Sequence, residues 1–237
     1  MGADYLRHVE GTGGYLVSSP FRASFREAWF DPEFWGRRAE PVTRGGRGAA
    51  WFVSAPTGDF VLRHFCRGGL PGRFIRRDYV FTRADAVRSF AEFQLLFRLR
   101  EQGLPVPEPI AAGYRKRGPL LYRAALIIRR IPGARPLTDF AGEDQEPVWT
   151  AAGQCIRRFH DASVFHADLN CLNILVADEV YLIDFDRGRI VTAPDTSDWR
   201  QANLNRLRRS VDKCLGHLDR QLRDRLWNRL LAGYQVQ

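Results

Sequence analysis

Three oxygen-bearing side chains in the second half of the chain have the types and spacing for chemistry. Asp168 and Asn173 lie five residues apart, and Asp184 follows an apolar stretch. The short apolar segments 174–176 and 181–183 are typical of a tight hairpin whose ends would bring Asn173 and Asp184 together. A converging carboxylate and amide suit Mg²⁺ that carries phosphate oxygens. Asp168 could accept the proton of an attacking hydroxyl, so the pattern predicts phosphoryl transfer to an alcohol.

The same residues carry a resemblance to a known group of enzymes. H-x-D-x-x-x-x-N, which begins at His166, and the following apolar-D-F-x resemble the catalytic loop and metal-binding segment of the protein-kinase-like fold. The resemblance implies that Asp168 is the catalytic base and that Asn173 and Asp184 bind Mg²⁺. We expect His166 to hold the metal-binding segment through backbone hydrogen bonds. The alternative, a chance set of polar residues, leaves five ordered positions unexplained.

A glycine-rich segment upstream agrees with this resemblance. Gly46 and Gly48 begin a stretch similar to the kinase loop G-x-G-x-x-G-x-V, with Trp51 in place of the third glycine. Glycines at these positions let backbone N–H groups approach the phosphates of ATP closely. A common glycine-rich hairpin turn is the alternative interpretation.

The cation that holds the nucleotide phosphates cannot be a lysine on the third predicted strand. No lysine precedes Lys116, and Arg63 stands where the kinase pattern has its lysine. We therefore assign phosphate binding to Arg63, with Glu92 on the following helix as its partner. The alternative is that Arg63 is a solvated strand residue. Backbone groups of Arg130 and Ile131, at the expected hinge, would meet the adenine.

The elements that must position these residues divide into a strand-rich front half and a helical back half. Turn residues and apolar patterns predict strands over 41–44, 49–54, 60–66, 110–114 and 121–131, a helix over 84–102, and mainly helices from 143 onward. The fold class is α+β: a two-lobed, protein-kinase-like fold with a small antiparallel N-lobe sheet plus one helix and a mostly helical C-lobe without an extended activation segment. The expected divisions are an aromatic and basic extension (1–40), the N-lobe (41–133) and the C-lobe (134–237).

Composition sets limits on location and partners. The 237 residues are 45% hydrophobic, enough for a core, and 36 Lys and Arg against 27 Asp and Glu leave a net charge of +9. A basic excess favours anionic partners such as phosphorylated molecules or an acidic membrane surface. No apolar run is long enough to span a bilayer, and no secretory signal is visible, so we expect a protein on the cytosolic side. The four cysteines lack zinc spacing and are expected to be reduced.

Longer stretches resemble one family in particular, the 3-deoxy-D-manno-octulosonic acid (Kdo) kinases, which are related to the heptose kinases of lipopolysaccharide core synthesis. The resemblance is carried by residues 61–70, 166–170, 183–189 and 199–204. It implies phosphorylation by ATP of the 4-hydroxyl of Kdo on a Kdo-lipid A precursor, at the cytoplasmic face of the bacterial inner membrane. Neither a nucleic-acid partner nor an obligate protein partner is expected. The chain after Asp186 has no A-P-E motif, which argues against a protein acceptor.

The acceptor would carry phosphates and carboxylates, so arginines are the candidate substrate ligands. The candidates are Arg67, Arg73, Arg76, Arg77, Arg187 and Arg189. Trp29, Phe30, Phe34 and Trp35 either seat the enzyme at a lipid interface or cap the N-lobe sheet.

Two rival functions remain open from the sequence. One is another small-molecule or atypical protein kinase of the same fold, such as a heptose, aminoglycoside or RIO-like kinase. The other is a basic nucleic-acid-binding module with vestigial kinase residues, although such a module need not keep Asp168, Asn173 and Asp184.

Overall fold

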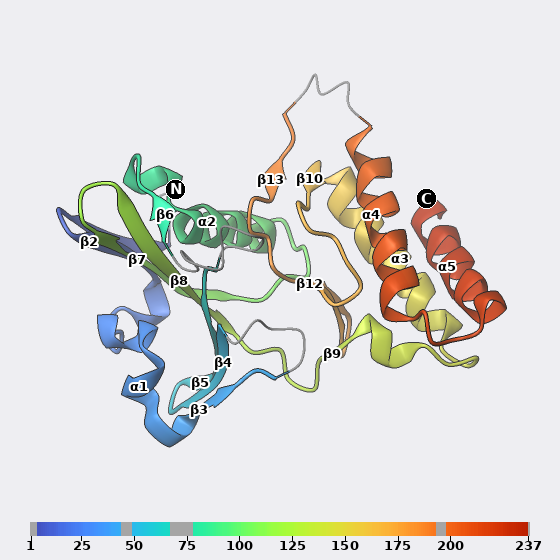
Figure 1. Cartoon of the computed structure of the whole chain (residues 1–237), viewed down its shortest axis with the longest axis horizontal. Coiled ribbons are helices and arrows are strands. Elements are labelled where there is room, and N and C mark those ends of the chain that lie inside the picture. The colour runs from blue at the N-terminus through green and yellow to red at the C-terminus, as the bar shows by residue number, and fades with distance from the viewer. Residues whose placement is uncertain (1–3, 44–48, 67–77, 193–197, 237) are drawn as a thin grey trace. The chain divides into compact units, whose positions relative to one another are not determined.

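The computed structural model describes residues 4–43, 49–66, 78–192 and 198–236. The chain forms two compact units, which we describe separately. The first comprises Met1–Phe97 and Glu108–Arg130, and the second comprises Arg98–Pro107 and Ile131–Gln237. A sheet dominates the first unit and helices dominate the second, which confirms the predicted α+β class (Figure 1).

The first unit is built on one antiparallel sheet. Its strands run in the order β1-β2-β7-β8-β5-β4-β3, and β6 pairs with β8. The predicted strands appear with shifted ends, whereas β1 and β2 were not predicted. Residues 1–40 were expected to be a separate extension, but β1 pairs with β2 and β2 pairs with β7, so both strands belong to the sheet. The strands are β1 Tyr5–Glu10, β2 Gly13–Ser18, β3 Ala39–Pro41, β4 Ala50–Ala55, β5 Gly58–His64, β6 Tyr79–Val80, β7 Pro109–Arg117 and β8 Leu121–Arg129.

Helix α2 (Arg88–Glu101) packs on one face of this sheet. The Ser89 hydroxyl donates to the Gly113 carbonyl at 2.9 Å, and the rings of Phe90 and Tyr114 meet edge to face at 5.3 Å. The predicted helix began at residue 84, but Val87 is extended and separates α2 from a short 3-10 turn. Helix α2 is held to the sheet through its contacts with β7.

The aromatic segment after β2 covers the opposite face. Trp29 and Trp35 are buried in one cluster with Phe60 of β5, and the Trp35 indole N–H donates to the Trp29 carbonyl at 2.9 Å. The single-turn helix α1 (Pro32–Trp35) lies in this segment. Both tryptophans therefore cap the sheet, the second of the two interpretations offered for them, whereas Phe34 stays exposed.

Three helices form most of the second unit: α3 (Glu146–Asp161), α4 (Trp199–Cys214) and α5 (Arg220–Gln235). Helices α4 and α5 are separated near Gly216, because α4 ends before it and Asp219 caps the start of α5 with its side chain. Figure 1 shows α3 and α5 running alongside each other. In the described residues, no helix is long and apolar enough to cross a membrane.

Two glycines let α3 and α5 touch backbone to backbone. A β-carbon on Gly153 would lie 1.9 Å from the carbonyl oxygen of Leu230, and one on Gly233 would lie 2.0 Å from that of Thr150. These distances are far inside van der Waals contact, so each site accepts only a hydrogen atom as its side chain.

Short strands hold the loops of the second unit. They are β9 Arg135–Pro136, β10 Val164–Phe165, β11 Ile174–Val176, β12 Val180–Leu182 and β13 Arg189–Ile190. Strands β10 and β13 form one antiparallel pair, and β12, β11 and β9 form a three-stranded sheet. The predicted hairpin over 174–183 is thus confirmed as β11 and β12.

Candidate active site

The β11–β12 hairpin positions two of the three predicted side chains. Ile174 pairs with Leu182, and the Ile183 N–H donates to the Asn173 carbonyl at 3.0 Å. Asn173 therefore lies opposite the residue that precedes Asp184, at one end of the hairpin. Asp184 has φ of 63°, in the left-handed region that non-glycine residues rarely adopt. Such backbone strain is common at functional sites because the surrounding structure must hold it in place.

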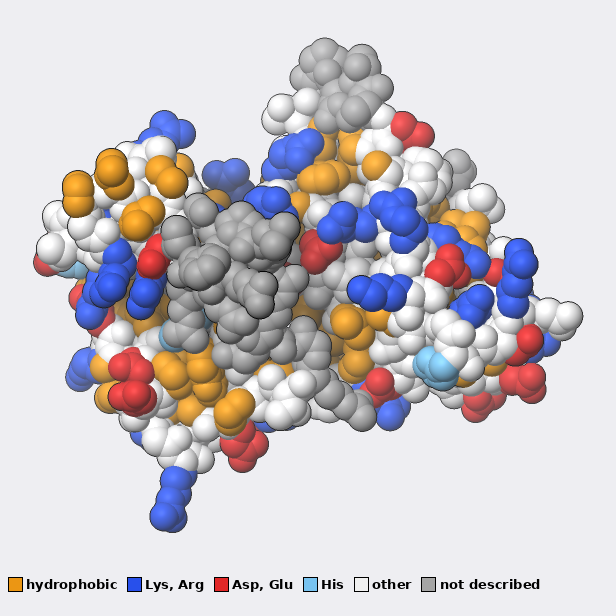
Figure 2. All heavy atoms as spheres, viewed as in Figure 1, with side chains coloured by type: hydrophobic (Ala, Val, Ile, Leu, Met, Phe, Trp, Pro, Cys, Tyr) orange, Lys and Arg blue, Asp and Glu red, His pale blue; other side chains and the backbone are white. Residues whose placement is uncertain are grey.

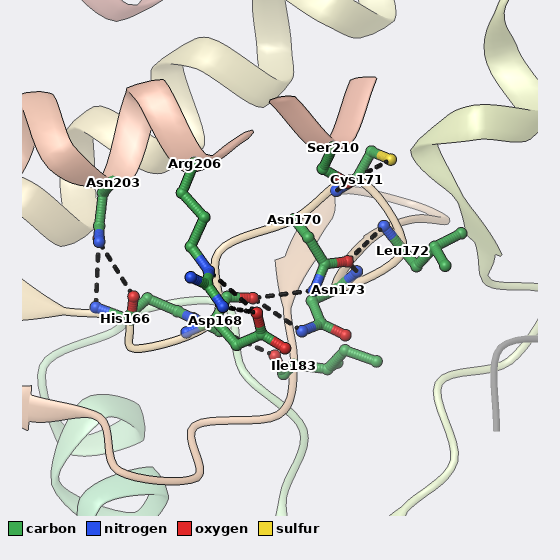
Figure 3. A network of polar contacts seen from close by, with 10 residues as sticks. All are labelled: His166, Asp168, Asn170, Cys171, Leu172, Asn173, Ile183, Asn203, Arg206 and Ser210. Carbon is green, nitrogen blue, oxygen red and sulfur yellow. Dashed lines mark hydrogen bonds and ion pairs between the residues drawn. The ribbon is translucent and has the colours of Figure 1, made fainter. Parts of the chain in front are cut away.

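The loop before β11 brings Asp168 to Asn173. The Asn173 amide Nδ2 donates to the Asp168 carbonyl at 3.0 Å, and the Asn173 N–H donates to the Asn170 carbonyl at 3.1 Å. Figure 3 shows the Asp168 and Asn173 side chains close together. The Asn173 amide oxygen accepts no hydrogen bond from the described residues, so it is available as a ligand.

His166 links the loop to the segment that carries Asp184. Its Nδ1 accepts the Asp168 N–H at 3.1 Å, and its Nε2 lies 2.9 Å from the Ile183 carbonyl. A backbone N–H can only donate and a carbonyl can only accept, so the proton resides on Nε2 and the ring is neutral. Burial lowers the pKa of His166, against a smaller opposing effect of its bond to Ile183. The structural role predicted for His166 is confirmed.

One face of α4 holds this loop at three points, which the sequence analysis did not foresee. The Asn203 amide both accepts the His166 N–H (3.3 Å) and donates to the His166 carbonyl (3.0 Å). One turn further along the helix Arg206 reaches Asp168, and after another turn the Ser210 hydroxyl accepts the Cys171 N–H at 3.2 Å (Figure 3). The spacing of three and four residues places the three side chains on the same helix face.

Arg206 forms an ion pair with the predicted base. Its Nε and Nη2 lie 3.0 Å and 2.6 Å from the same oxygen, Oδ1 of Asp168. The Asp168 side chain is 48% exposed and that of Arg206 is 45% exposed. The only sequence signal for Arg206 was its place three residues after Asn203. Asn203 belongs to the stretch 199–204, which resembles the Kdo kinases.

The first unit contains the other predicted pair. Arg63 on β5 forms an ion pair with Glu92 on α2, so the predicted contact is present. The Glu92 side chain is 3% exposed and that of Arg63 is 24% exposed. The Arg63 guanidinium also lies over the Phe65 ring, 4.8 Å from its centre.

Of the remaining predicted residues, four lie in the described part of the chain and six lie outside it. The Arg130 N–H donates to the Asp59 carbonyl at 2.9 Å, and the Ile131 carbonyl accepts the Ala134 N–H at 3.4 Å. Arg187 is exposed with φ of 60°, and the Arg189 guanidinium lies 4.3 Å from the centre of the Phe165 ring. Outside the described residues lie Gly46, Gly48, Arg67, Arg73, Arg76 and Arg77.

The donor atoms at the hairpin end suit a magnesium ion better than a metal held by protein alone. No cluster of three or more His, Cys, Asp or Glu exists among the described residues. The groups present are the Asn173 amide and the Asp184 carboxylate. Mg²⁺ in nucleotide sites usually has one or two such protein ligands and completes its shell with water and phosphate oxygens. All four cysteines are free thiols, as expected.

Known proteins resemble the whole chain in sequence. Residues 32–234 match the lipopolysaccharide kinase (Kdo/WaaP) family. A 3-deoxy-D-manno-octulosonic acid kinase of Stenotrophomonas maltophilia (strain K279a) is 43% identical over 97% of this chain and 92% of its own length. A protein of the same name from Xanthomonas axonopodis pv. citri (strain 306) is 46% identical over 97% of this chain and 92% of its own.

Solved structures resemble it in fold. WaaP in complex with acyl carrier protein aligns with a TM-score of 0.57 at 17% identity, covering 93% of this chain and 88% of that one. A glucosamine kinase in complex with glucosamine, ADP and inorganic phosphate aligns with a TM-score of 0.54 at 14% identity, covering 98% and 78%. These likenesses confirm the predicted kinase-like fold.

Proposed function

Because the chain belongs to the lipopolysaccharide kinase (Kdo/WaaP) family, we propose that it transfers the γ-phosphoryl group of ATP to the 4-hydroxyl of Kdo on a Kdo-lipid A precursor. The observation that supports this most directly is the meeting of the Asp168 loop with the end of the β11–β12 hairpin. In this arrangement Asp168 lies next to Asn173, and Asn173 lies opposite Ile183, the residue before Asp184.

Asp168 acts on the acceptor. Its Oδ2 makes no hydrogen bond with the described residues, since Arg206 uses only Oδ1. The acceptor hydroxyl donates to Oδ2, which orients it for in-line attack and takes its proton. A positioned base of this kind contributes about 10²–10⁴-fold to a rate. Phosphoryl transfer otherwise depends on positioning and charge neutralisation.

The Asn173 amide oxygen and the Asp184 carboxylate hold Mg²⁺. When bound, this ion neutralises the negative charge of the phosphate oxygens. The chain's own contribution is to fix the two ligands: the hairpin ladder fixes Asn173, and the bond from His166 to the Ile183 carbonyl fixes the residue before Asp184. His166 is therefore a positioning residue.

Residues of the first unit, together with Ile131, bind the nucleotide. Arg63, fixed by Glu92, contacts the α- and β-phosphates. The Arg130 carbonyl and the Ile131 N–H are the groups for adenine, because the Arg130 N–H and the Ile131 carbonyl already have partners. The glucosamine kinase of similar fold was solved with ADP, which agrees with a nucleotide substrate.

The acceptor is a lipid, so the enzyme works as a peripheral protein at the cytoplasmic face of the inner membrane. The net charge of +9 favours an anionic surface. Figure 2 shows Lys and Arg side chains over α4 and the neighbouring helices, with fewer acidic side chains among them. Co-sedimentation with vesicles tests this: binding to anionic but not to zwitterionic lipid is expected, and equal binding to both would contradict the electrostatic contribution.

Transfer of label from [γ-³²P]ATP tests the activity. We expect label on Kdo-lipid A precursor and none on heptosylated core or casein, and label on casein alone would overturn the proposal. Asp168→Asn should lower turnover by about 10³-fold, because it removes the base and keeps the shape. Asp178→Asn is the matched control, since Asp178 is exposed in the turn of the same hairpin; it should retain full activity.

A further inference from the structure

Arg206 has binding capacity that its ion pair with Asp168 leaves unused. A guanidinium carries five N–H donors. Two of its nitrogens contact Oδ1 of Asp168, and Nη1 makes no contact with a described residue. Nearly half of the side chain is exposed. An anion that binds beside Asp168 would therefore meet an accessible guanidinium with unused N–H donors.

Arg206 is not needed to hold α4 against the loop. Asn203, one turn before it, binds both backbone groups of His166, and Ser210, one turn after it, binds Cys171. Exposed ion pairs contribute little to stability. The pair with Asp168 can therefore reorganise while the loop stays in place, as a substrate-binding contact requires.

The proposed acceptor has a matching group. In Kdo the hydroxyl-bearing carbon 4 is two bonds from carbon 2, which carries the carboxylate. Once the hydroxyl is bound to Oδ2 of Asp168, this carboxylate is kept near the same edge of the loop. Arginine presents paired donors that suit a planar carboxylate.

We propose that Arg206 binds the carboxylate of the acceptor sugar acid, while Asp168 binds its hydroxyl, so that the two residues together select an acidic sugar over a neutral one. This rests on the proposed function. It adds to the predicted arginines a ligand on α4, in contact with the catalytic base. The same guanidinium keeps the Asp168 carboxylate turned toward the acceptor.

Comparing two acceptors tests this assignment. One is Kdo-lipid A precursor, and the other is the same molecule with the Kdo carboxylate as its methyl ester. Arg206→Gln should lower kcat/KM at least tenfold for the acid, mainly by raising KM for the acceptor, and less than threefold for the ester. Arg206→Lys should recover part of the loss for the acid, and KM for ATP should not change.

Equal losses for acid and ester would overturn the inference and leave Arg206 as a residue that only orients Asp168. Arg209→Gln is the matched control, since Arg209 is exposed on the same helix; it should behave as the wild type toward both acceptors. If the wild type labels neither acceptor, the proposed function itself fails. Thermal unfolding of each variant verifies the fold, and Arg206→Lys provides the test if Arg206→Gln does not fold.

Discussion

The two units each contain an arginine–carboxylate pair at a proposed site, and the pairs differ in burial. Glu92 is 3% exposed and its partner Arg63 24%, whereas Asp168 and Arg206 are 48% and 45% exposed. A buried carboxylate deprived of its cation is left without solvation, so its pair is hard to break. An exposed carboxylate is solvated by water instead. The first pair therefore suits fixed phosphate binding, and the second leaves donors of its arginine accessible to a substrate.

The difference in burial follows from the elements that carry each pair. Arg63 lies on β5, between β4 and β8, and Glu92 lies on the helix that covers the sheet. Arg206 projects from a helix onto a loop at the protein surface. The same two chemical groups therefore differ in function because of their positions.

Removing the cation from each pair should give the largest contrast. Arg63→Met is expected to lower the free energy of unfolding by about 3 kcal/mol, because the buried Glu92 carboxylate loses this cation. Arg206→Met should cost less than about 1 kcal/mol, because water replaces the guanidinium. Urea unfolding of the two variants measures both values.

A double variant separates lost pairing from lost packing. Arg63→Met with Glu92→Leu should recover most of the stability, since both charged groups leave the interior together. If the double variant is as unstable as Arg63→Met alone, the loss of this ion pair is not the cause. Equal losses from Arg63→Met and Arg206→Met would remove the distinction between the pairs.

Acid should destabilise the second unit through a buried histidine. Burial lowers the pKa of His160 from 6.5 to about 4. As the pH falls from 6.5 toward 4, the unfolded chain binds a proton that the folded one does not, so folding loses about 3 kcal/mol across this window. Unfolding measured at several pH values checks this, and His160→Gln should flatten the dependence. An unchanged slope in that variant would assign the acid loss elsewhere.

Arg63→Lys is expected to have a smaller effect, on nucleotide binding. The ammonium keeps the charge beside Glu92 but loses the two-pronged geometry of a guanidinium. KM for ATP should rise about tenfold, the equivalent of one charge-assisted hydrogen bond. Steady-state kinetics with varied ATP measures it. An unchanged KM would show that charge alone suffices at this position.

The smallest expected effects concern backbone strain. Ser163 and Arg187 have φ near +60°, so Ser163→Gly and Arg187→Gly should each stabilise the protein by about 1 kcal/mol. Only Arg187→Gly should reduce activity, if Arg187 contacts the acceptor as predicted. Ser163→Ala is the control, because alanine has the same backbone cost as serine. Thermal unfolding and turnover on the same samples compare the two.

Local patterns predicted the parts of the site that lie close in sequence. The hairpin over 174–183 has apolar strands and a polar turn, and the residues at its ends follow from strand pairing. The contact of Arg63 with Glu92 followed from a strand and a helix in the kinase order. In the first case the side chains lie where the periodicity of the hairpin places them, and in the second the resemblance to kinases indicated the two partners.

Contacts between distant segments escaped prediction. Asn203 and Arg206 meet a loop almost 40 residues earlier in the chain, and the sequence of α4 alone indicates only a basic helix with one apolar side. Strand β1 mixes polar and apolar residues because it is an edge strand, and its neighbour β2 pairs with a strand that begins at Pro109. Contacts of this kind form only when the whole chain is folded, so they produce no periodic pattern in the sequence.

The close backbone contacts at Gly153 and at Gly233 make the second unit sensitive at positions far from Asp168 in the chain. Because each backbone nearly touches the other helix, even alanine would wedge α3 and α5 apart. Helix α3 also presents the His160 carbonyl that anchors Arg200 at the start of α4. A small steric change between α3 and α5 can thus shift α4, whose face supports the catalytic loop. Inactivating substitutions in a mutational survey would then include residues that never meet a substrate.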